Sequence, residues 1–385
     1  MKRILYIFPT LKPGGAEKAA IQIANYLVRR QSYSITFYLF DDSDYYKDLI
    51  DPNIVIIRSV NRFDRGSKMS YWYHYYVRAG IELFHFLGKE QFDFIVGIHE
   101  QIPEVISAAA KMLLWITGVK KVTQYISVIA TNLSGLHKDR THMTSRLLFV
   151  FLRWIRRSVF SSIIVLTRAM QNEMRGQSKS IVLIPNPVEI EELSRCTVKE
   201  ISEMPVPGSY VIYVGRVTPQ KNQLLLLQAF KEIFRSVIFD IVMIGYVNDP
   251  MYEEELKMFA ATNGFSNRVH FLGAVQQPYQ IIANAKALVL TSNYEGLPMS
   301  LLESMALNIP VIMTRYDGYE EYFSDDTATI VNKNSVDELS NALLSVQLND
   351  ERLSANAQRA KEYVRRFDIS VIGEMYHKLF SGEVI

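Results

Sequence analysis

Residues 287–306 read Ala-Leu-Val-Leu-Thr-Ser-Asn-Tyr-Glu-Gly-Leu-Pro-Met-Ser-Leu-Leu-Glu-Ser-Met-Ala, which joins a short apolar run, a polar loop and a run of helical period. Ala287–Leu290 has the length and composition of a buried strand, and Gly296 lies in the loop. Pro298 stands where the first helical turn should begin, and Asn308 with Pro310 marks the end of the helix. At the carboxyl edge of a parallel sheet, such a unit presents backbone N–H groups and a helix N-terminus, which favour an anion.

The same alternation of short apolar runs and helical stretches extends along most of the chain. Runs such as Ile4–Phe8 and Phe92–Ile98 carry apolar residues on both faces, which is typical of parallel strands covered by helices. The alternation pauses from Pro185 to Pro207 and resumes at Tyr210–Val214. We therefore predict an α/β fold of two Rossmann-like, doubly wound parallel-sheet domains that face a central cleft, with a hinge near residues 185–208.

Composition excludes several classes of protein. A chain of 385 residues with 49% hydrophobic and 21% charged residues is long enough for two globular domains and is not disordered. The net charge of +2 does not call for nucleic acid as a partner, and the single cysteine, Cys196, fits a reducing compartment. Neither a signal peptide nor an apolar run near the ~20 residues of a membrane span is recognisable, so we expect a cytoplasmic protein.

Two glutamates accompany the loop and the helix of residues 287–306. Glu295 lies in the loop and Glu303 in the helix, with seven residues between them. Carboxylates beside an anion site are unfavourable unless they accept hydrogen bonds from hydroxyl groups, and sugar and ribose hydroxyls are such donors. The alternative interpretation is that Glu295 is a loop surface residue and Glu303 a solvated helix position.

A second cluster follows the predicted strand Tyr210–Val214. Gly215 permits a tight turn, Arg216 offers a planar fork for phosphate, and Lys221 adds a point charge. Asn222 is placed to cap the helix that follows. The alternative is a charged surface turn, which accounts for a lone lysine better than for the Gly-Arg pair.

A third cluster, Gly14-Gly15-Ala16-Glu17, lies between the first strand and the first helix. In this order and spacing the three clusters, followed by Pro310-Val311-Ile312, resemble the family-4 (group 1) retaining glycosyltransferases of the GT-B type. The resemblance extends to about residue 367, and Ile184–Val188 looks like the interdomain joint of that family. It implies an N-terminal acceptor domain over residues 1–187, a C-terminal donor domain over residues 188–365, and a helix over residues 366–385 that packs back on the first domain.

The resemblance also implies roles for individual residues. Arg216 and Lys221 would neutralise the donor diphosphate, Glu295 would bind hydroxyls of the transferred sugar, and Glu303 would bind those of the ribose. Gly15 would contact the donor phosphate when the domains close. The implied donor-binding set is Gly15, Gly215, Arg216, Lys221, Glu295, Gly296, Leu297, Pro298, Met299 and Glu303. The implied catalytic set is Arg216, Lys221, Glu295 and His99.

His99 follows the predicted strand Phe92–Ile98, where members of the family often carry a histidine that contacts the transferred sugar. A loop or helix-capping histidine is an equal alternative. The family is regarded as metal-independent, so neither a metal nor a cofactor is expected beyond the nucleotide-sugar co-substrate. By the same analogy, transfer retains the anomeric configuration without a protein nucleophile, and the acceptor attacks from the leaving-group side.

A basic stripe marks a possible membrane-facing helix. Arg146, Arg153 and Arg157 share one helical face, with Arg156 beside them and Trp154 among the bulky apolar residues nearby. This pattern suits anionic lipid headgroups, although the outer face of an ordinary buried helix is the alternative. We therefore expect peripheral binding at the cytoplasmic membrane face, a UDP-linked donor, and a lipid-linked oligosaccharide as acceptor in surface polysaccharide or glycan assembly.

Two other functions remain open at this point. A nucleotide-sugar 2-epimerase could use the same architecture, but the paired glutamates with the Gly-Arg turn argue against it. A non-catalytic sugar-nucleotide-binding subunit would carry a vestigial site, whereas the motifs are intact here. The sequence does not identify the sugar, the nucleobase, the acceptor, the linkage or the oligomeric state.

Overall fold

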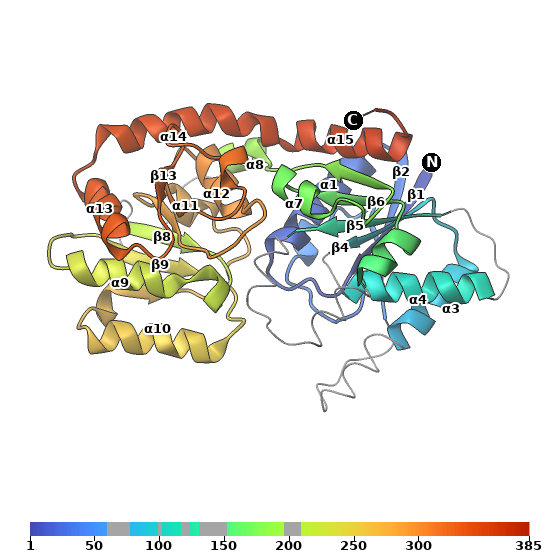
Figure 1. The fold of residues 1–385 in the computed structure, drawn as a ribbon, viewed down its shortest axis with the longest axis horizontal. Helices are drawn as coiled ribbons and strands as arrows, with labels where there is room; N and C mark the ends of the chain where they lie inside the picture. The colour runs from blue at the N-terminus through green and yellow to red at the C-terminus, as the bar shows by residue number, and fades with distance from the viewer. Residues whose placement is uncertain (60–77, 99–101, 117–122, 131–151, 196–208, 385) are drawn as a thin grey trace. The chain divides into compact units, whose positions relative to one another are not determined.

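The computed structural model describes residues 1–59, 78–98, 102–116, 123–130, 152–195 and 209–384. The chain divides into two compact units (Figure 1). Unit 1 comprises Met1–Pro185 with Ser370–Ile385, and unit 2 comprises Asn186–Ile369. Each unit is built on a parallel sheet with helices between its strands, which confirms the predicted α/β fold of two Rossmann-like domains.

The sheet of unit 1 has the spatial strand order β3-β2-β1-β4-β5-β6-β7. Its strands are β1 (Lys2–Phe8), β2 (Tyr33–Leu39), β3 (Val55–Arg58), β4 (Phe94–Ile98), β5 (Gln124–Ile129), β6 (Ser162–Val165) and β7 (Ser180–Leu183). Its helices are α1 (Gly15–Arg29), η1 (Lys47–Leu49), α3 (Ala79–Lys89), α4 (Ile102–Ile116), a helix over residues 152–159, α7 (Arg168–Glu173) and α15 (Ile369–Ser381). The order reverses between β1 and β4, so the loops after these two strands flank the point where ligands bind in such sheets.

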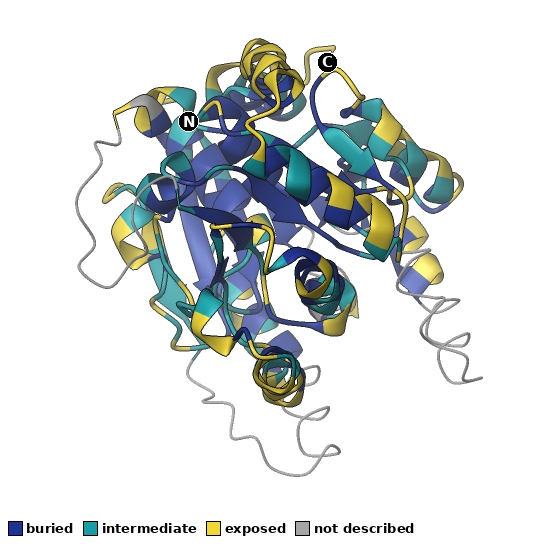
Figure 2. Ribbon diagram, turned by 90° about the vertical axis from the view of Figure 1, so that its left-hand side faces the viewer, coloured by how far each residue is buried: buried dark blue, intermediate teal, exposed yellow. Residues whose placement is uncertain are grey.

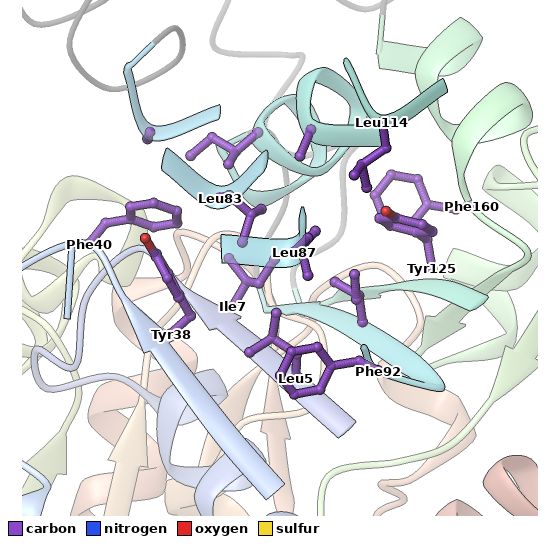
Figure 3. Close-up of a cluster of buried hydrophobic side chains, with 14 of the residues drawn as sticks. Leu5, Ile7, Tyr38, Phe40, Leu83, Leu87, Phe92, Leu114, Tyr125 and Phe160 are labelled. Atoms are coloured by element: carbon purple, nitrogen blue, oxygen red, sulfur yellow. The ribbon is translucent and has the colours of Figure 1, made fainter. Parts of the chain in front are cut away.

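Alternation along the central strand β1 supplies both layers of the unit 1 core. Leu5 and Ile7 belong to a buried cluster with side chains from α3, α4 and β5 (Figure 3). Tyr6 and Phe8 point to the opposite face, where both rings pack edge-on against Phe37 of β2. Because both faces of the strand are buried, its sequence is almost continuously apolar.

The C-terminal helix α15 contributes to the core of unit 1 from Ser370 onward. Phe380 packs on Phe94 of β4 with ring centroids 4.9 Å apart. Glu374 forms an ion pair with Arg30. Gly373 lies against Tyr26 so closely that an added Cβ would come within 2.3 Å of the ring. A larger residue at position 373 would therefore displace the helix from α1.

The sheet of unit 2 has the spatial order β10-β9-β8-β11-β12-β13. Its strands are β8 (Tyr210–Val214), β9 (Asp240–Ile244), β10 (Val269–Phe271), β11 (Leu288–Leu290), β12 (Val311–Thr314) and β13 (Thr329–Val331). Its helices are α8 (Ile190–Ser194), η3 (Pro219–Lys221), α9 (Gln223–Ile233), α10 (Pro250–Thr262), η4 (Ser266–Arg268), α11 (Tyr279–Ala283), α12 (Met299–Ala306), η5 (Tyr319–Glu321), α13 (Val336–Gln347), α14 (Glu351–Tyr363) and η6 (Val364–Phe367).

The helices of unit 2 form two packed groups, α9 with α10 and α13, and α12 with α8, α11 and α14. The strands are largely buried, and the exposed positions lie on the outer turns of helices and in loops (Figure 2). The order of the strands reverses between β8 and β11, which are neighbours in the sheet although two strands separate them along the chain. The loops after β8 and β11 therefore meet at the carboxyl edge of the sheet.

Candidate functional site

The loop after β8 begins with a turn that depends on a glycine in another loop. The Gly215 amide donates to the Ile244 carbonyl over 2.9 Å, which brings the loop after β8 against the end of β9. A Cβ added to Gly245 would lie 1.9 Å from the Gly215 carbonyl oxygen. Gly245 thus permits the close approach of the two loops and holds the backbone on which Arg216 stands, while the Arg216 side chain remains exposed.

Lys221 ends the short helix η3, and its backbone is tied to two neighbouring strands. The Tyr213 hydroxyl of β8 donates to the Lys221 carbonyl over 2.6 Å. Thr291, which follows β11, donates to the Asn222 carbonyl over 2.7 Å. These contacts place Lys221 at the edge between β8 and β11.

Asn222 occupies the predicted N-cap position of α9, but the cap hydrogen bond expected of its side chain is absent. Its side-chain amide approaches Asn334 at 3.4 Å instead. Asn222 has a left-handed backbone conformation with φ of 49°. Asparagine tolerates this conformation better than most residues, so the position turns the chain between η3 and α9.

Glu295 and Lys221 form an ion pair, although 74 residues separate them in the sequence. The two side chains are 9% and 12% exposed. The loop that carries Glu295 is anchored beside η3, because the backbone N–H of Asn293 donates to the Gln220 carbonyl over 2.9 Å. Gln220 in turn donates to the Tyr294 carbonyl over 2.9 Å. Two clusters that are separate in the sequence therefore form one charged site.

Gly296, Leu297 and Pro298 lead from Glu295 into α12. Pro298 is the N-cap residue of this helix, one position before the first-turn position predicted for it. The Leu297 carbonyl accepts a hydrogen bond of 2.7 Å from the Asn186 amide group, which fixes the approach to the helix. The start of α12 thus faces the same sheet edge as Glu295.

Glu303 is 4% exposed, and every residue of α12 from Met299 to Ala306 is buried. The alternative interpretation of Glu303 as a solvated helix position is therefore excluded. Glu295 is 8% exposed and ion-paired, so it is not an ordinary loop surface residue either. Both carboxylates are buried within unit 2, where charged side chains are rarely found unless they have a partner.

Gly15 belongs to unit 1, whereas the other predicted donor-binding residues belong to unit 2. It is the first residue of α1, directly after the N-cap Gly14. Tyr46 holds this turn, because its hydroxyl contacts both the amide nitrogen and the carbonyl of Gly14 at 3.1 Å. His99 lies outside the described residues, so its predicted role stays a prediction.

The predicted basic stripe divides into exposed and buried members. Arg153, Trp154 and Arg157 are exposed, with 62% of Trp154 accessible, and Arg146 lies outside the described residues. Arg156, which lies next to Arg157 in the sequence, does not share their exposure. Arg156 is 1% exposed and binds both carboxylate oxygens of Glu104, at 2.8 and 3.0 Å.

Sequence reasoning missed Tyr316, which follows β12 and is 3% exposed. Its hydroxyl has no hydrogen-bond partner within the described part of the chain. Burial, and after it the negative charge of Glu295, raise the pKa of Tyr316 well above its ordinary value. The sequence could have indicated Tyr316 through its place just after the strand β12, which pairs with β11 in the structure. Among the described residues, no group of three or more His, Cys, Asp or Glu side chains could hold a metal ion.

Comparison with known families covers both units. Residues 196–366 match the model described as "Glycosyl transferases group 1", and residues 13–192 match "Glycosyltransferase Family 4". A Campylobacter jejuni protein is 24% identical over 387 residues, which is 99% of each chain. It is named GalNAc-alpha-(1->4)-GalNAc-alpha-(1->3)-diNAcBac-PP-undecaprenol alpha-1,4-N-acetyl-D-galactosaminyltransferase.

Two further similarities concern the activity and the fold. An Escherichia coli protein named UDP-Gal:alpha-D-GlcNAc-diphosphoundecaprenol alpha-1,3-galactosyltransferase is 26% identical over 181 residues, 45% of this chain and 47% of that protein. The crystal structure of Anabaena HepE in complex with UDP and glucose superimposes with a TM-score of 0.79 and 19% identity. The superposition covers 99% of this chain and 100% of the other, and it shows a shared fold.

Proposed function

Because this chain belongs to the family-4 glycosyltransferases of the GT-B type, we propose that it transfers a sugar from a UDP-sugar to a hydroxyl of a lipid-diphosphate-linked saccharide, with retention of anomeric configuration. The observation that carries this proposal is the Lys221–Glu295 pair beside the start of α12. A cation suited to phosphate and a carboxylate suited to hydroxyls meet at the switch point of the unit 2 sheet.

The chemistry of the site follows from where charge develops. Breaking the bond between the sugar and the diphosphate builds negative charge on the leaving diphosphate and positive charge on the sugar ring. Lys221 and Arg216, together with the N-terminus of α12, stabilise the diphosphate. Glu295 accepts hydrogen bonds from the transferred sugar and Glu303 from the ribose, in keeping with the burial of both carboxylates.

UDP as the nucleotide and retention as the stereochemical course are supported by the relatives. The Escherichia coli protein is named for UDP-Gal, and the Anabaena structure holds UDP. Both named relatives form alpha linkages. Transfer from an α-linked UDP-sugar with retention gives such a product, so the acceptor would attack from the side of the leaving diphosphate.

A lipid-linked acceptor at a membrane surface is supported by exposed side chains of unit 1. Helix α4 exposes Met112, Trp115 and Ile116, with Trp115 81% accessible. The helix over residues 152–159 packs beside α4, since the Lys111 ammonium donates to the Val159 carbonyl over 2.7 Å. This second helix exposes Trp154 between Arg153 and Arg157.

Tryptophan beside arginine suits the interface between water and anionic lipid. Within the described residues, no helix combines the length and hydropathy needed to cross a bilayer. We therefore place the protein peripherally, on the membrane face where nucleotide sugars are available.

Ligand stabilisation followed by product analysis tests the proposal. We expect UDP and one of UDP-glucose, UDP-galactose, UDP-N-acetylglucosamine or UDP-N-acetylgalactosamine to raise Tm, because a ligand at 100 times its Kd stabilises by about 2.7 kcal/mol. Incubation with that donor and an undecaprenyl-diphosphate-linked saccharide should yield an α-linked product, identified by NMR. Absence of stabilisation by all four donors would contradict the proposal, and release of an epimerised sugar nucleotide would favour the isomerase.

A further inference from the structure

Tyr316 buries a hydroxyl for which the described part of the chain offers no hydrogen-bond partner. Its side chain is 3% exposed. Burial of an unpaired hydroxyl costs stability that phenylalanine in the same place would not cost. Buried polar groups of native proteins are nearly always paired, so the hydroxyl of Tyr316 calls for an explanation.

The hydroxyl lies at the edge of the sheet that carries the proposed donor site. Tyr316 follows β12, which pairs in parallel with β11. The Thr314 hydroxyl donates over 2.9 Å to the Ser292 carbonyl, which ties the loop after β12 to the loop that carries Glu295. Thr218, in the loop after β8, likewise buries a hydroxyl for which the described residues offer no partner. Both hydroxyl groups thus belong to loops at the sheet edge that carries the Lys221–Glu295 pair.

The charge of Glu295 reaches the Tyr316 hydroxyl. After burial, this carboxylate is the largest cause that raises the pKa of Tyr316. A carboxylate disfavours a nearby phenolate but favours a phenol that donates a hydrogen bond to it. The neutral Tyr316 is therefore suited to donate to Glu295.

Binding of a nucleotide diphosphate changes which hydrogen-bond donors are available to the Glu295 carboxylate. In the free protein the carboxylate is paired with the Lys221 ammonium. A diphosphate competes for this ammonium, and the carboxylate then requires other donors because a buried unpaired charge is costly. An ionised carboxylate has about four acceptor positions, enough for one protein hydroxyl and the hydroxyls of a sugar.

We propose that Tyr316 is a positioning residue for sugar transfer, whose hydroxyl donates to the Glu295 carboxylate once the diphosphate engages Lys221 and so holds that carboxylate toward the sugar hydroxyls. This inference rests on the proposed function and deepens it. It assigns Tyr316 to the recognition of the sugar and not of the nucleotide.

The test compares Tyr316→Phe with Tyr319→Phe, a matched control. The Tyr319 ring packs on Tyr316 with centroids 6.3 Å apart, and Tyr319 has no role in the proposed site. The ligands are UDP and whichever of the four UDP-sugars stabilises the wild type most. We expect Tyr316→Phe to melt at or above the wild-type temperature and to keep its UDP affinity within twofold. Its affinity for the UDP-sugar and its kcat/KM should fall by about tenfold or more, the size of a hydrogen bond to a charged group.

A double-mutant cycle with Glu295→Ala, which removes the acceptor, separates positioning from packing. Because Tyr316 acts through Glu295, Tyr316→Phe should cause no further loss of UDP-sugar affinity in the Glu295→Ala background. Three results would each overturn this inference while leaving the proposed function intact. They are an equal loss of UDP-sugar affinity in both backgrounds, a Tyr316→Phe variant as active as wild type, and an equal loss of affinity for UDP and for the UDP-sugar. A wild type that no UDP-sugar stabilises would overturn the proposed function and this inference with it.

Discussion

Two ion pairs of this chain join residues that are distant in the sequence, and they differ in how completely they are satisfied. In unit 1, Arg156 binds Glu104 through two bonds, Ser127 donates to the same carboxylate over 2.8 Å, and Gln177 accepts from the guanidinium. Both ionic side chains are at most 1% exposed. In unit 2, Lys221 and Glu295 form a single contact at a sheet edge and remain about a tenth exposed.

This difference in burial and hydrogen bonding distinguishes the structural pair Arg156–Glu104 from the pair Lys221–Glu295, whose ion pair a ligand can displace. Every oxygen of the Glu104 carboxylate is engaged by fixed partners, so a ligand would gain nothing there. Lys221 carries a compact charge on a flexible stem, and it lies beside a helix start that favours anions. A diphosphate can therefore exchange with Glu295 as the partner of Lys221. The next four predictions test this contrast.

The largest expected effect is on the stability of unit 1. Arg156→Ala leaves the Glu104 carboxylate buried without its cation and should cost about 3–5 kcal/mol of unfolding free energy. Arg157→Ala, one residue along the same helix and exposed, should change it by no more than about 0.5 kcal/mol. Urea unfolding followed by tryptophan fluorescence reports on this unit, since positions 72, 115 and 154 all fall within its chain segment. Equal losses for the two variants would contradict the structural role of the buried pair.

Removal of the positive charge of Lys221 or Arg216 in unit 2 should affect activity much more than folding. Lys221→Ala and Arg216→Ala should each lower transfer by about 10²–10³-fold, because the leaving diphosphate loses charge stabilisation. Steady-state kinetics with the UDP-sugar measures the loss, and the melting temperature of each variant serves as the control for folding. Turnover near that of wild type in both variants would remove these cations from the mechanism.

The exposed arginines beside Arg156 should matter for membranes and not for folding. We expect Arg153→Glu combined with Arg157→Glu to weaken binding to vesicles that contain anionic lipid by about thirtyfold or more, because each basic residue contributes roughly 1 kcal/mol. The wild-type interaction should weaken as salt rises, because charges are screened within about 10 Å at 0.1 M. Arg352→Glu combined with Lys361→Glu, an equal charge change at exposed positions of unit 2, is the control. Equal loss in both variants would indicate a general charge effect.

The smallest expected effect is that of metal removal. We propose that the cations at the diphosphate are Lys221 and Arg216, so EDTA should leave kcat/KM within about twofold of its untreated value. The measurement is the initial rate of transfer before and after chelation. Loss of activity that manganese or magnesium restores would show that a divalent ion shares the role of these side chains.

The fold and the motifs were largely readable from the sequence because both depend on local patterns. Apolar runs buried on two faces, such as Ile4–Phe8, indicated parallel strands, and the structure confirms the sheets. Gly215-Arg216 and Glu295-Gly296 were recognisable because turns and helix starts need particular residues next to one another. Asn222 shows the limit of such local reasoning, since its residue type fits both a cap and a left-handed turn, and only the backbone conformation distinguishes them.

By itself, the sequence determined two α/β domains, a charged turn after one strand and a glutamate pair around another loop. Only the tertiary structure decided that Lys221 meets Glu295, that Arg156 is buried against Glu104, and that the Tyr316 hydroxyl lacks a partner among the described residues. The physical reason is that the periodicity of apolar residues determines which face of a helix or strand is buried, whereas the spatial order of the strands determines which loops become neighbours. The partner of a charged side chain is a property of that order, so residues 74 positions apart become one site only when β8 and β11 lie side by side.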